Sequence, residues 1–387
     1  MSAVAVKGWC PGALRPMLSG DGLVVRIRPR AGRLDAAQGA GIAELAARYG
    51  NGLIDLTSRA NLQIRGVSDE GYPPLVDGLA ELGLLDADST AEAQRNILVT
   101  PFWTAADETR SLATELEQGL ASASLDLPTK FGFAIDDGNA RMLAGASADI
   151  RIERDRSGEL LVRADGAQRG LSVRRSEVVQ AALALAEWFV ASGGARGEKR
   201  RMAAHLAGGA SVPETLRGDA EPLVRSADPA PGLYPAGAMV GVVFGQMPHQ
   251  TLGDLAGCAQ ALRMTPWRMM LVEGMREMRR GSELVTEAGD PRLRVVACSG
   301  APRCGEAHAD TRMLASALAR HIPPDARLHV SGCAKGCAHS GSADVTLVGT
   351  DDGFDLIRRG TTRDAPVIRG LTSSYLVVNP SVLTGGH

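Results

Sequence analysis

The sequence lacks a surplus of positive charge. Its 387 residues include 42 Lys and Arg against 44 Asp and Glu, which gives a formal net charge of −2. Proteins that bind nucleic acids or membrane surfaces through charge carry a basic excess, so we expect neither partner. With 44% hydrophobic residues, a chain of this length can form two domains or one fold that is repeated internally.

Lysine is scarce among the basic residues. Only Lys7, Lys130, Lys199 and Lys335 are lysines, and the other 38 basic residues are arginines. A coding bias toward Arg accounts for most of this imbalance. Two of the four lysines nevertheless fall within motifs described below.

Long apolar runs are also absent. The N-terminus has no basic start followed by an apolar stretch, and the most apolar helical stretch, from Val178 to Val190, is interrupted by Gln180 and Glu187. A membrane-spanning helix needs about 20 consecutive apolar residues. We therefore expect a cytoplasmic protein with no membrane partner.

Cysteines are too few for a disulfide scaffold, but four of the six lie within forty residues. Cys298 and Cys304 form one close pair, and Cys333 and Cys337 form a second. Zinc sites usually space such pairs two residues apart, whereas these spacings are five and three and are filled with small residues. The pattern favours a [4Fe–4S] cluster over zinc. The two remaining cysteines, Cys10 and Cys258, are interpreted as buried apolar residues.

Two pairs of segments repeat along the chain. Residues 32–66 resemble residues 245–274, each with a strand, a helix rich in small residues, and a Thr-led strand that ends on Gly. Residues 146–152 resemble residues 341–347, and Thr109–Ala113 is echoed by a second Thr-Arg segment that begins at Thr311. The shared order of the copies predicts an internally duplicated α/β protein.

The copies are separated by a helix and a connector. Ser176 is a plausible N-cap for a helix that ends at Gly193. Residues 207–237, rich in Gly, Pro, Asp and Ser, are predicted to connect the two halves.

The cysteine motif CxxxxxC followed by CxxxC resembles that of the nitrite/sulfite reductase superfamily. This resemblance implies a pseudo-twofold α/β (α+β) fold of ferredoxin-like half-domains and two cluster-type domains, with cluster ligands only in the second copy. Consistent with this, the sequence has no cysteine between Arg95 and Asp149. The implied segments are half-domain 1 at 12–80, the first cluster-type domain at 90–206, the connector at 207–237, half-domain 2 at 238–283, and the second cluster-type domain at 290–380.

In this superfamily cationic side chains bind an oxyanion beside siroheme. Residues 57–63 (TSRANLQ) resemble the strand that carries the first arginine, which corresponds to Arg59. Residues 94–97 (QRNI) and 127–132 (LPTKFG) resemble the next two motifs and imply roles for Arg95 and Lys130. Gly132 stands where a second lysine is expected, and losing one cation disfavours reduction of nitrite or sulfite.

Residues 10–17 (CPGALRPM), 19–29 (SGDGLVVRIRP) and 50–66 resemble the precorrin-3B synthase family more than the reductases. The resemblance implies an O2-dependent monooxygenase of aerobic cobalamin biosynthesis. Its substrate would be precorrin-3A, hydroxylated at C20 with closure of a γ-lactone. The cluster would relay electrons from a donor, either NADH or a reductase.

The resemblance also implies a mononuclear non-haem iron. The histidines at 205, 249, 308, 321, 329 and 339 show no 2-His-1-carboxylate spacing, so none is assigned to it. Guanidinium groups bind carboxylates in bidentate fashion, and arginines on strands beside the matched motifs are candidates for the acidic arms of the substrate. These are Arg26, Arg28, Arg65 and Arg268. Cys337 would act as a cluster ligand without bridging to a metal in the macrocycle.

Two alternative functions remain open from the sequence. The first is a siroheme-dependent sulfite or nitrite reductase, in which siroheme would be a cofactor. The second is a non-catalytic module that binds a tetrapyrrole or carries electrons.

Overall fold

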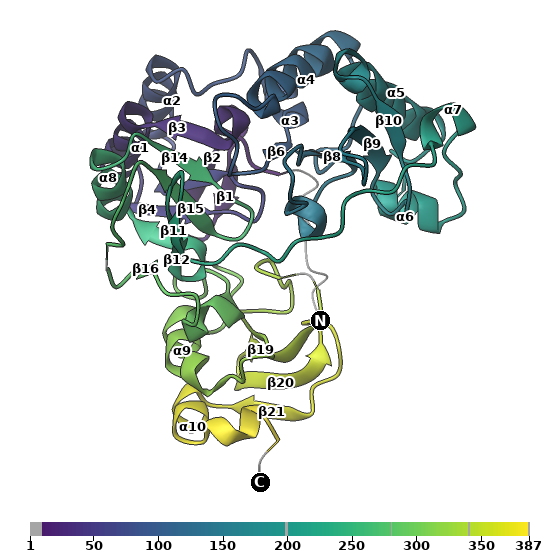
Figure 1. Cartoon of the computed structure of the whole chain (residues 1–387). Coiled ribbons are helices and arrows are strands. Elements are labelled where there is room, and N and C mark those ends of the chain that lie inside the picture. Colours follow the sequence, from purple (N-terminus) through teal and green to yellow (C-terminus); the bar gives the residue numbers. More distant parts are fainter. Residues whose placement is uncertain (1–9, 198–199, 280, 340, 386–387) are drawn as a thin grey trace.

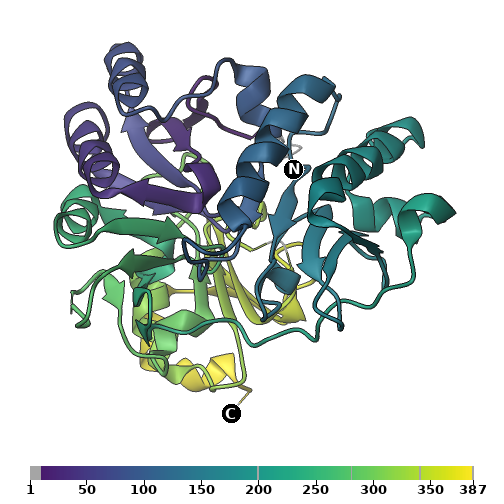
Figure 2. The ribbon, with the colours of Figure 1, turned by 45° about the horizontal axis from the view of Figure 1, so that its top comes forward.

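The computed structural model describes residues 10–197, 200–279, 281–339 and 341–385. Figure 1 shows a lobe that contains α1, α2 and α8, a second lobe that contains α4 and α5, and a third that contains β19–β21. Figure 2 shows the same three groups of elements after the molecule is turned. None of the helices in these described ranges is long and apolar enough to cross a membrane.

Two antiparallel sheets form the first lobe and exchange strands. The first sheet has the order β1 (Met17–Ser19), β2 (Gly22–Ile27), β5 (Leu62–Val67), β4 (Leu53–Leu56), β13 (Gln246–Pro248). The second has the order β11 (Gly232–Tyr234), β12 (Gly237–Val242), β15 (Met269–Glu273), β14 (Ala261–Met264), β3 (Arg33–Asp35), with β16 (Leu284–Val285) beside β12. Because β13 completes the first sheet and β3 completes the second, the two half-domains are interlocked.

Three helices cover this lobe, namely α1 (Ala36–Tyr49), α2 (Tyr72–Glu81) and α8 (His249–Gly257). Asp35 begins α1 with a capping box, in which its side chain accepts from the Gln38 amide and the Gln38 side chain accepts from the Asp35 amide. Gly39 allows α1 to pack closely on α8, since a Cβ there would lie 2.9 Å from the Ala256 Cβ.

Two mixed sheets form the other lobes and share one topology. The first has the order β6 (Ile97–Val99), β7 (Phe133–Ile135), β8 (Ile150–Arg154), β9 (Leu160–Ala164), β10 (Leu171–Val173). The second has the order β17 (Val295–Ala297), β18 (Leu328–Ser331), β19 (Ala343–Thr350), β20 (Gly353–Gly360), β21 (Ile368–Leu371). In each, the first three strands are parallel and the last two join antiparallel. The helices outside the first lobe are α3 (Ser89–Gln94), α4 (Thr109–Ala123), α5 (Val178–Ala191), α6 (Met202–Ala207), α7 (Glu214–Arg217), α9 (Thr311–Leu318), α10 (Ser373–Val378).

Backbone conformation repeats along with topology. Ala31 and Phe244, just before β3 and β13, have φ of 47° and 51°. Ala60 and Arg268, in the turns before β5 and β15, have φ of 54° and 57°. Non-glycine residues rarely adopt positive φ, so these matched pairs mark equivalent turns. The predicted α/β fold is therefore confirmed, and the repeated topology and backbone conformation are consistent with the predicted duplication.

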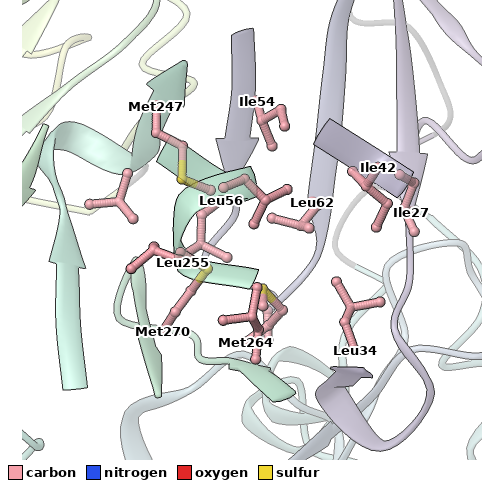
Figure 3. Packing of buried hydrophobic residues seen from close by; sticks show 14 of the residues in the cluster. Ile27, Leu34, Ile42, Ile54, Leu56, Leu62, Met247, Leu255, Met264 and Met270 are labelled. Carbon is pink, nitrogen blue, oxygen red and sulfur yellow. The ribbon is translucent and has the colours of Figure 1, made fainter. Parts of the chain in front are cut away.

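The core of the first lobe draws on both halves of the chain. Ile54, Leu62 and Leu34 from the first half pack with Met247 and Met264 from the second, and all are fully or almost fully buried (Figure 3). Removing either half would expose the apolar face of the other.

One local prediction differs from the structure. Ser176 lies inside a 3-10 turn at Arg175–Glu177, and Glu177 precedes α5 without a side-chain cap. The segment predicted as a connector, residues 207–237, is partly paired with the sheets, because β11 pairs with β12 and residues 220 and 222 form bridges next to β10 and β8. Backbone hydrogen bonding prevailed there over a composition typical of loops.

Candidate functional site

A cavity of about 490 Å³ lies between the first sheet and the cysteine loops. It brings together residues far apart in the sequence. Those predicted as site residues are Arg26, Arg59, Arg65, Lys130, Arg268, Cys298 and Cys337. Those that sequence reasoning did not assign to a site include Cys10, Asp55, Gln63, Phe244 and Arg312.

Arg59 reaches the cavity from a tight turn between β4 and β5. The Thr57 hydroxyl accepts from the amides of Arg59 and Asn61, and Ala60 adopts positive φ. The guanidinium donates to the Lys130 carbonyl at 3.1 Å, so Arg59 and Lys130 are neighbours as the motifs implied. Burial, followed by the charge of Arg201, lowers the pKa of Arg59.

Two further arginines enter from the second half. Arg268 donates to the carbonyl of Ala338 at 2.8 Å, directly after Cys337. Arg312, near the start of α9, donates to the carbonyl of Val243 at 2.8 Å. Burial is the main cause that lowers the pKa of both groups.

These cationic groups are not matched by acidic partners. In the described part of the chain, Arg59, Arg268 and Arg312 form no ion pair with a carboxylate, and they donate hydrogen bonds to carbonyl and hydroxyl oxygens instead. Arg26 likewise donates to the Gln63 amide oxygen. These arginines are half-buried, and a partly desolvated charge without a counterion costs free energy, so the cavity is suited to a ligand with several negative groups.

Arg65 lines the cavity but is already paired. Its guanidinium contacts Asp21 at 2.7 Å and Asp55 at 3.1 Å and also donates to Ser19. Burial lowers the pKa of Arg65, but the two carboxylates outweigh burial and raise it. Its predicted role in binding a substrate carboxylate would require exchanging these partners.

Two of the predicted arginines do not line the cavity. Arg95 is held by Asp86 through bonds of 2.7 and 2.8 Å in a buried pair, so its guanidinium is not offered to a ligand. Arg28 is buried and donates to the Asn96 side chain. Burial, then the charge of Arg26, lowers the pKa of Arg28 to about 10. Arg28 lies just after β2 rather than on it, and Arg95 follows the end of α3; the sequence motifs do not reveal the neighbours of either arginine.

The four clustered cysteines come together beside the cavity. Burial is the main cause that raises the pKa of Cys333 and Cys337. The charges of Cys298 and Cys304 raise the pKa of both thiols further. The Gly332 amide donates to the Cys298 sulfur at 3.1 Å. Four thiols within electrostatic reach, with an amide donor and loops of small residues, fit a [4Fe–4S] cluster.

No mononuclear metal site emerges. Within the described ranges, no three His, Cys, Asp or Glu side chains are arranged to hold a single metal ion. The ring centroids of His329 and His339 are 5.7 Å apart, and neither ring nitrogen of the buried His329 has a hydrogen-bond partner among the described residues. Burial, with His339 and Arg268 nearby, lowers the pKa of His329 to about 4. These residues do not fit the implied non-haem iron.

Cys10 and Cys258 are both only partly buried. Cys258 contacts the carbonyls of Asp254 and Leu255 at the end of α8. Cys10 lines the cavity and forms a side-chain hydrogen bond with Arg26. The interpretation of Cys10 as an apolar core residue is therefore wrong, and its position within the CPG motif was the available signal.

The equivalent face of the second sheet is filled. The aligned repeats match Arg59 to Trp267 and Gln63 to Leu271. Leu271 packs with Met239 and Met269 in an apolar cluster that also includes Trp267. The aligned repeats also match the Asp55–Arg65 ion pair to one between Arg263 and Glu273, with the charges reversed, and Arg263 lies 3.6 Å from the Trp103 ring centroid. The first sheet thus presents a polar face to the cavity, whereas apolar side chains cover the equivalent face of the second sheet.

Residues 15–82 match the nitrite/sulfite reductase ferredoxin-like half domain. The chain is 28% identical to a precorrin-3B synthase of Sinorhizobium sp., over 93% of this chain and 84% of that protein. It is 26% identical to a ferredoxin–nitrite reductase of Leptolyngbya laminosa, over 88% of this chain and 79% of that protein.

A solved structure extends the comparison to the fold. The NirA protein of Mycobacterium tuberculosis matches with a TM-score of 0.60 at 18% identity, over 92% of this chain and 79% of that chain. The chain therefore has the fold of that protein, and its resemblance to precorrin-3B synthase, first seen in short motifs, extends over nearly its whole length.

Proposed function

We propose that this chain is a precorrin-3B synthase, an oxidoreductase that binds precorrin-3A in the cavity and adds one oxygen atom to it. The observation that carries the proposal is the arginine-rich cavity that opens onto Cys298 and Cys337. The acetate and propionate arms of the substrate would supply the missing negative charge. Arg26, Arg59, Arg268 and Arg312 are the groups we assign to these arms.

The proposed reaction balances with O2 and two electrons. One oxygen atom becomes the C20 hydroxyl as the ring-A acetate closes a γ-lactone, and the other leaves as water with two protons. Lys130 lies beside Arg59 in the cavity lining, and we assign it the role of passing a proton to the departing oxygen. We assign no step to a mononuclear iron, because the described residues offer no site for one.

Cys298, Cys304, Cys333 and Cys337 would hold a [4Fe–4S] cluster. When bound, such a cluster supplies single electrons. The electrons would come from NADH or a reductase. We place the protein in the cytoplasm, where thiols remain reduced.

The test is a pair of measurements on protein purified without air. Its visible spectrum should show cluster absorbance without siroheme bands, and Cys298→Ala should remove that absorbance. Precorrin-3A should be consumed only when O2 and reductant are both present. Turnover under strict anaerobiosis would contradict the proposal.

A siroheme-dependent nitrite or sulfite reductase is the second candidate, because nitrite reductases are among the relatives. Position 132 bears on this choice. A Cβ on Gly132 would lie 3.9 Å from Arg59 Nη1, so a lysine there would share the site with Arg59. Without it, the site has one proton-donating cation fewer.

If the protein is a reductase, its visible spectrum should show siroheme bands, and it should consume nitrite or sulfite when reduced methyl viologen supplies electrons. A non-catalytic module would instead bind precorrin-3A without converting it in the presence of O2 and reductant. The same preparations therefore separate all three functions.

A further inference from the structure

A row of four polar side chains crosses the first sheet, and three of them line the cavity. Arg26 on β2 is directly opposite Gln63 on β5, which is opposite Asp55 on β4, which is opposite Gln246 on β13. Directly opposed residues share one face of a sheet. This row, called the floor row below, contains one carboxylate, that of Asp55.

Hydrogen bonds in the floor row converge on Asp55. Gln63 accepts from Arg26 at 3.0 Å and turns its amide nitrogen to Asp55 Oδ2 at 3.4 Å. On the other side, Gln246 accepts from Arg303 at 3.2 Å and donates to Asp55 Oδ1 at 2.7 Å. In both glutamine side chains the amide oxygen accepts from an arginine and the amide nitrogen donates to Asp55.

Asp55 retains room for one more donor. Arg65 adds a bond of 3.1 Å to Oδ2, so three protein donors reach the carboxylate. A carboxylate offers about four acceptor positions, and Asp55 lines the cavity. The remaining position is available to a ligand.

Cationic groups surround this carboxylate. Burial lowers the pKa of Arg26, Arg268 and Arg312, and the charge of Asp55 acts in the opposite direction on each. These arginines come from three separate parts of the chain, namely β2, the turn before β15, and α9. The cavity therefore presents one acceptor among several cations.

A tetrapyrrole without a metal has the matching distribution, with acidic arms at its rim and N–H donors at its centre. We propose, on the basis of the proposed function, that Asp55 is a specificity-determining residue that accepts a hydrogen bond from these inner N–H groups. Asp55 would thereby make the cavity select metal-free tetrapyrroles over their metal complexes. A metal complex has lost the inner protons and leaves Asp55 without this donor, which disfavours its binding.

The experiment compares two probes that differ only at the ring centre. Sirohydrochlorin is metal-free, and siroheme is its iron complex with the same acidic arms. Both are titrated anaerobically into the full-length protein and followed by absorbance. We expect sirohydrochlorin to bind roughly 10- to 100-fold more tightly, the range for a hydrogen bond to a charged group.

Two variants assign the preference to Asp55. Asp55→Asn should lower the preference at least tenfold. Asp21→Asn is the matched control, because Asp21 also pairs with Arg65, at 2.7 Å, but does not line the cavity. It should retain the wild-type preference.

The outcomes separate this inference from the function on which it rests. Binding of neither probe would overturn both. Equal or tighter binding of siroheme by the wild type, or an unchanged preference in Asp55→Asn, would overturn the role of Asp55 alone. The wild-type comparison needs no variant, so a folding defect in Asp55→Asn would not remove the test.

Discussion

At the scale of single residues, Arg59 and Arg95 differ in their partners although both lie in motifs for anion binding. Among the described residues Arg59 is half-buried and has no carboxylate partner, whereas Asp86 binds the Nε and Nη2 atoms of Arg95. A guanidinium can serve a ligand only when the protein has not already neutralised it. The partners of each arginine, more than its motif, therefore decide its role.

Arg59→Met and Arg95→Met should separate binding from stability. Arg59→Met should weaken sirohydrochlorin binding at least tenfold, because a charge-assisted hydrogen bond is lost. Arg95→Met should instead lower the free energy of unfolding by about 3 kcal/mol, because Asp86 loses its buried partner. Urea unfolding and absorbance titration measure the two effects, and an Arg95→Met protein with normal stability but no binding would contradict the assignment.

Asp136 makes stability depend on pH. Its side chain accepts from the Leu143 amide at 2.7 Å, while Oδ1 has no partner in the described residues. Burial raises the pKa of Asp136 to about 7, and Glu153 adds to the increase. In the unfolded chain the value is about 3.9. The folded state thus holds the proton more tightly, and its stability falls as pH rises from about 4 to 7.

Asp136→Asn should remove this dependence, because the amide stays neutral and can still accept from Leu143. At pH 8 the variant should melt a few degrees above the wild type, whereas at pH 4 the two should differ little. Thermal unfolding across this range measures the effect. A variant less stable than the wild type at pH 8 would contradict it.

At the scale of elements, the turn between β1 and β2 packs against the cysteine loop. A Cβ on Gly20 would lie 2.1 Å from the Gly305 nitrogen, next to Cys304. The Gly305 nitrogen belongs to the backbone and not to the end of a flexible side chain. Any side chain at position 20 must therefore displace either the β1–β2 turn or the cysteine loop. A turn in the first half therefore helps to position a cysteine in the second.

Gly20→Ala should reduce iron and sulfide bound per chain to below half the wild-type amount while leaving the helical circular dichroism signal unchanged. Gly289→Ala is the control, because nothing lies within 4 Å of a Cβ at that exposed position. Chemical iron and sulfide analysis measures the result. Full loading of Gly20→Ala would show that the two loops do not depend on each other.

At the scale of the whole molecule, strand exchange ties the halves together. β13 pairs with β4, β3 pairs with β14, and Met247 and Met264 pack in one core with Ile54. The cavity requires the same arrangement, because Arg59 and Arg268 come from different halves.

Separating the halves should therefore abolish folding of each. Fragments 1–228 and 229–387, expressed alone, should be insoluble or aggregated, since each exposes an unpaired strand and an apolar face. Expressed together, they should elute as one complex in gel filtration. A soluble monomeric fragment would show that one half suffices for its own core.

Local sequence determined the elements and the repeats of this protein. Strand, helix and turn signals recur in the same order in residues 32–66 and 245–274, and both copies form the predicted elements because these signals act over a few neighbours. The spacing of the four cysteines likewise indicated one site, and their thiols lie within electrostatic reach of one another.

Tertiary structure alone decided which charges face the cavity. Asp86 binds Arg95, Asp21 binds Arg65, and no carboxylate pairs with Arg268 within the described residues. Likewise, only the pairing of β13 with β4 brings Gln246 to Asp55 across 191 positions of the chain. Such pairings depend on the distance between side chains after folding, which local sequence does not encode.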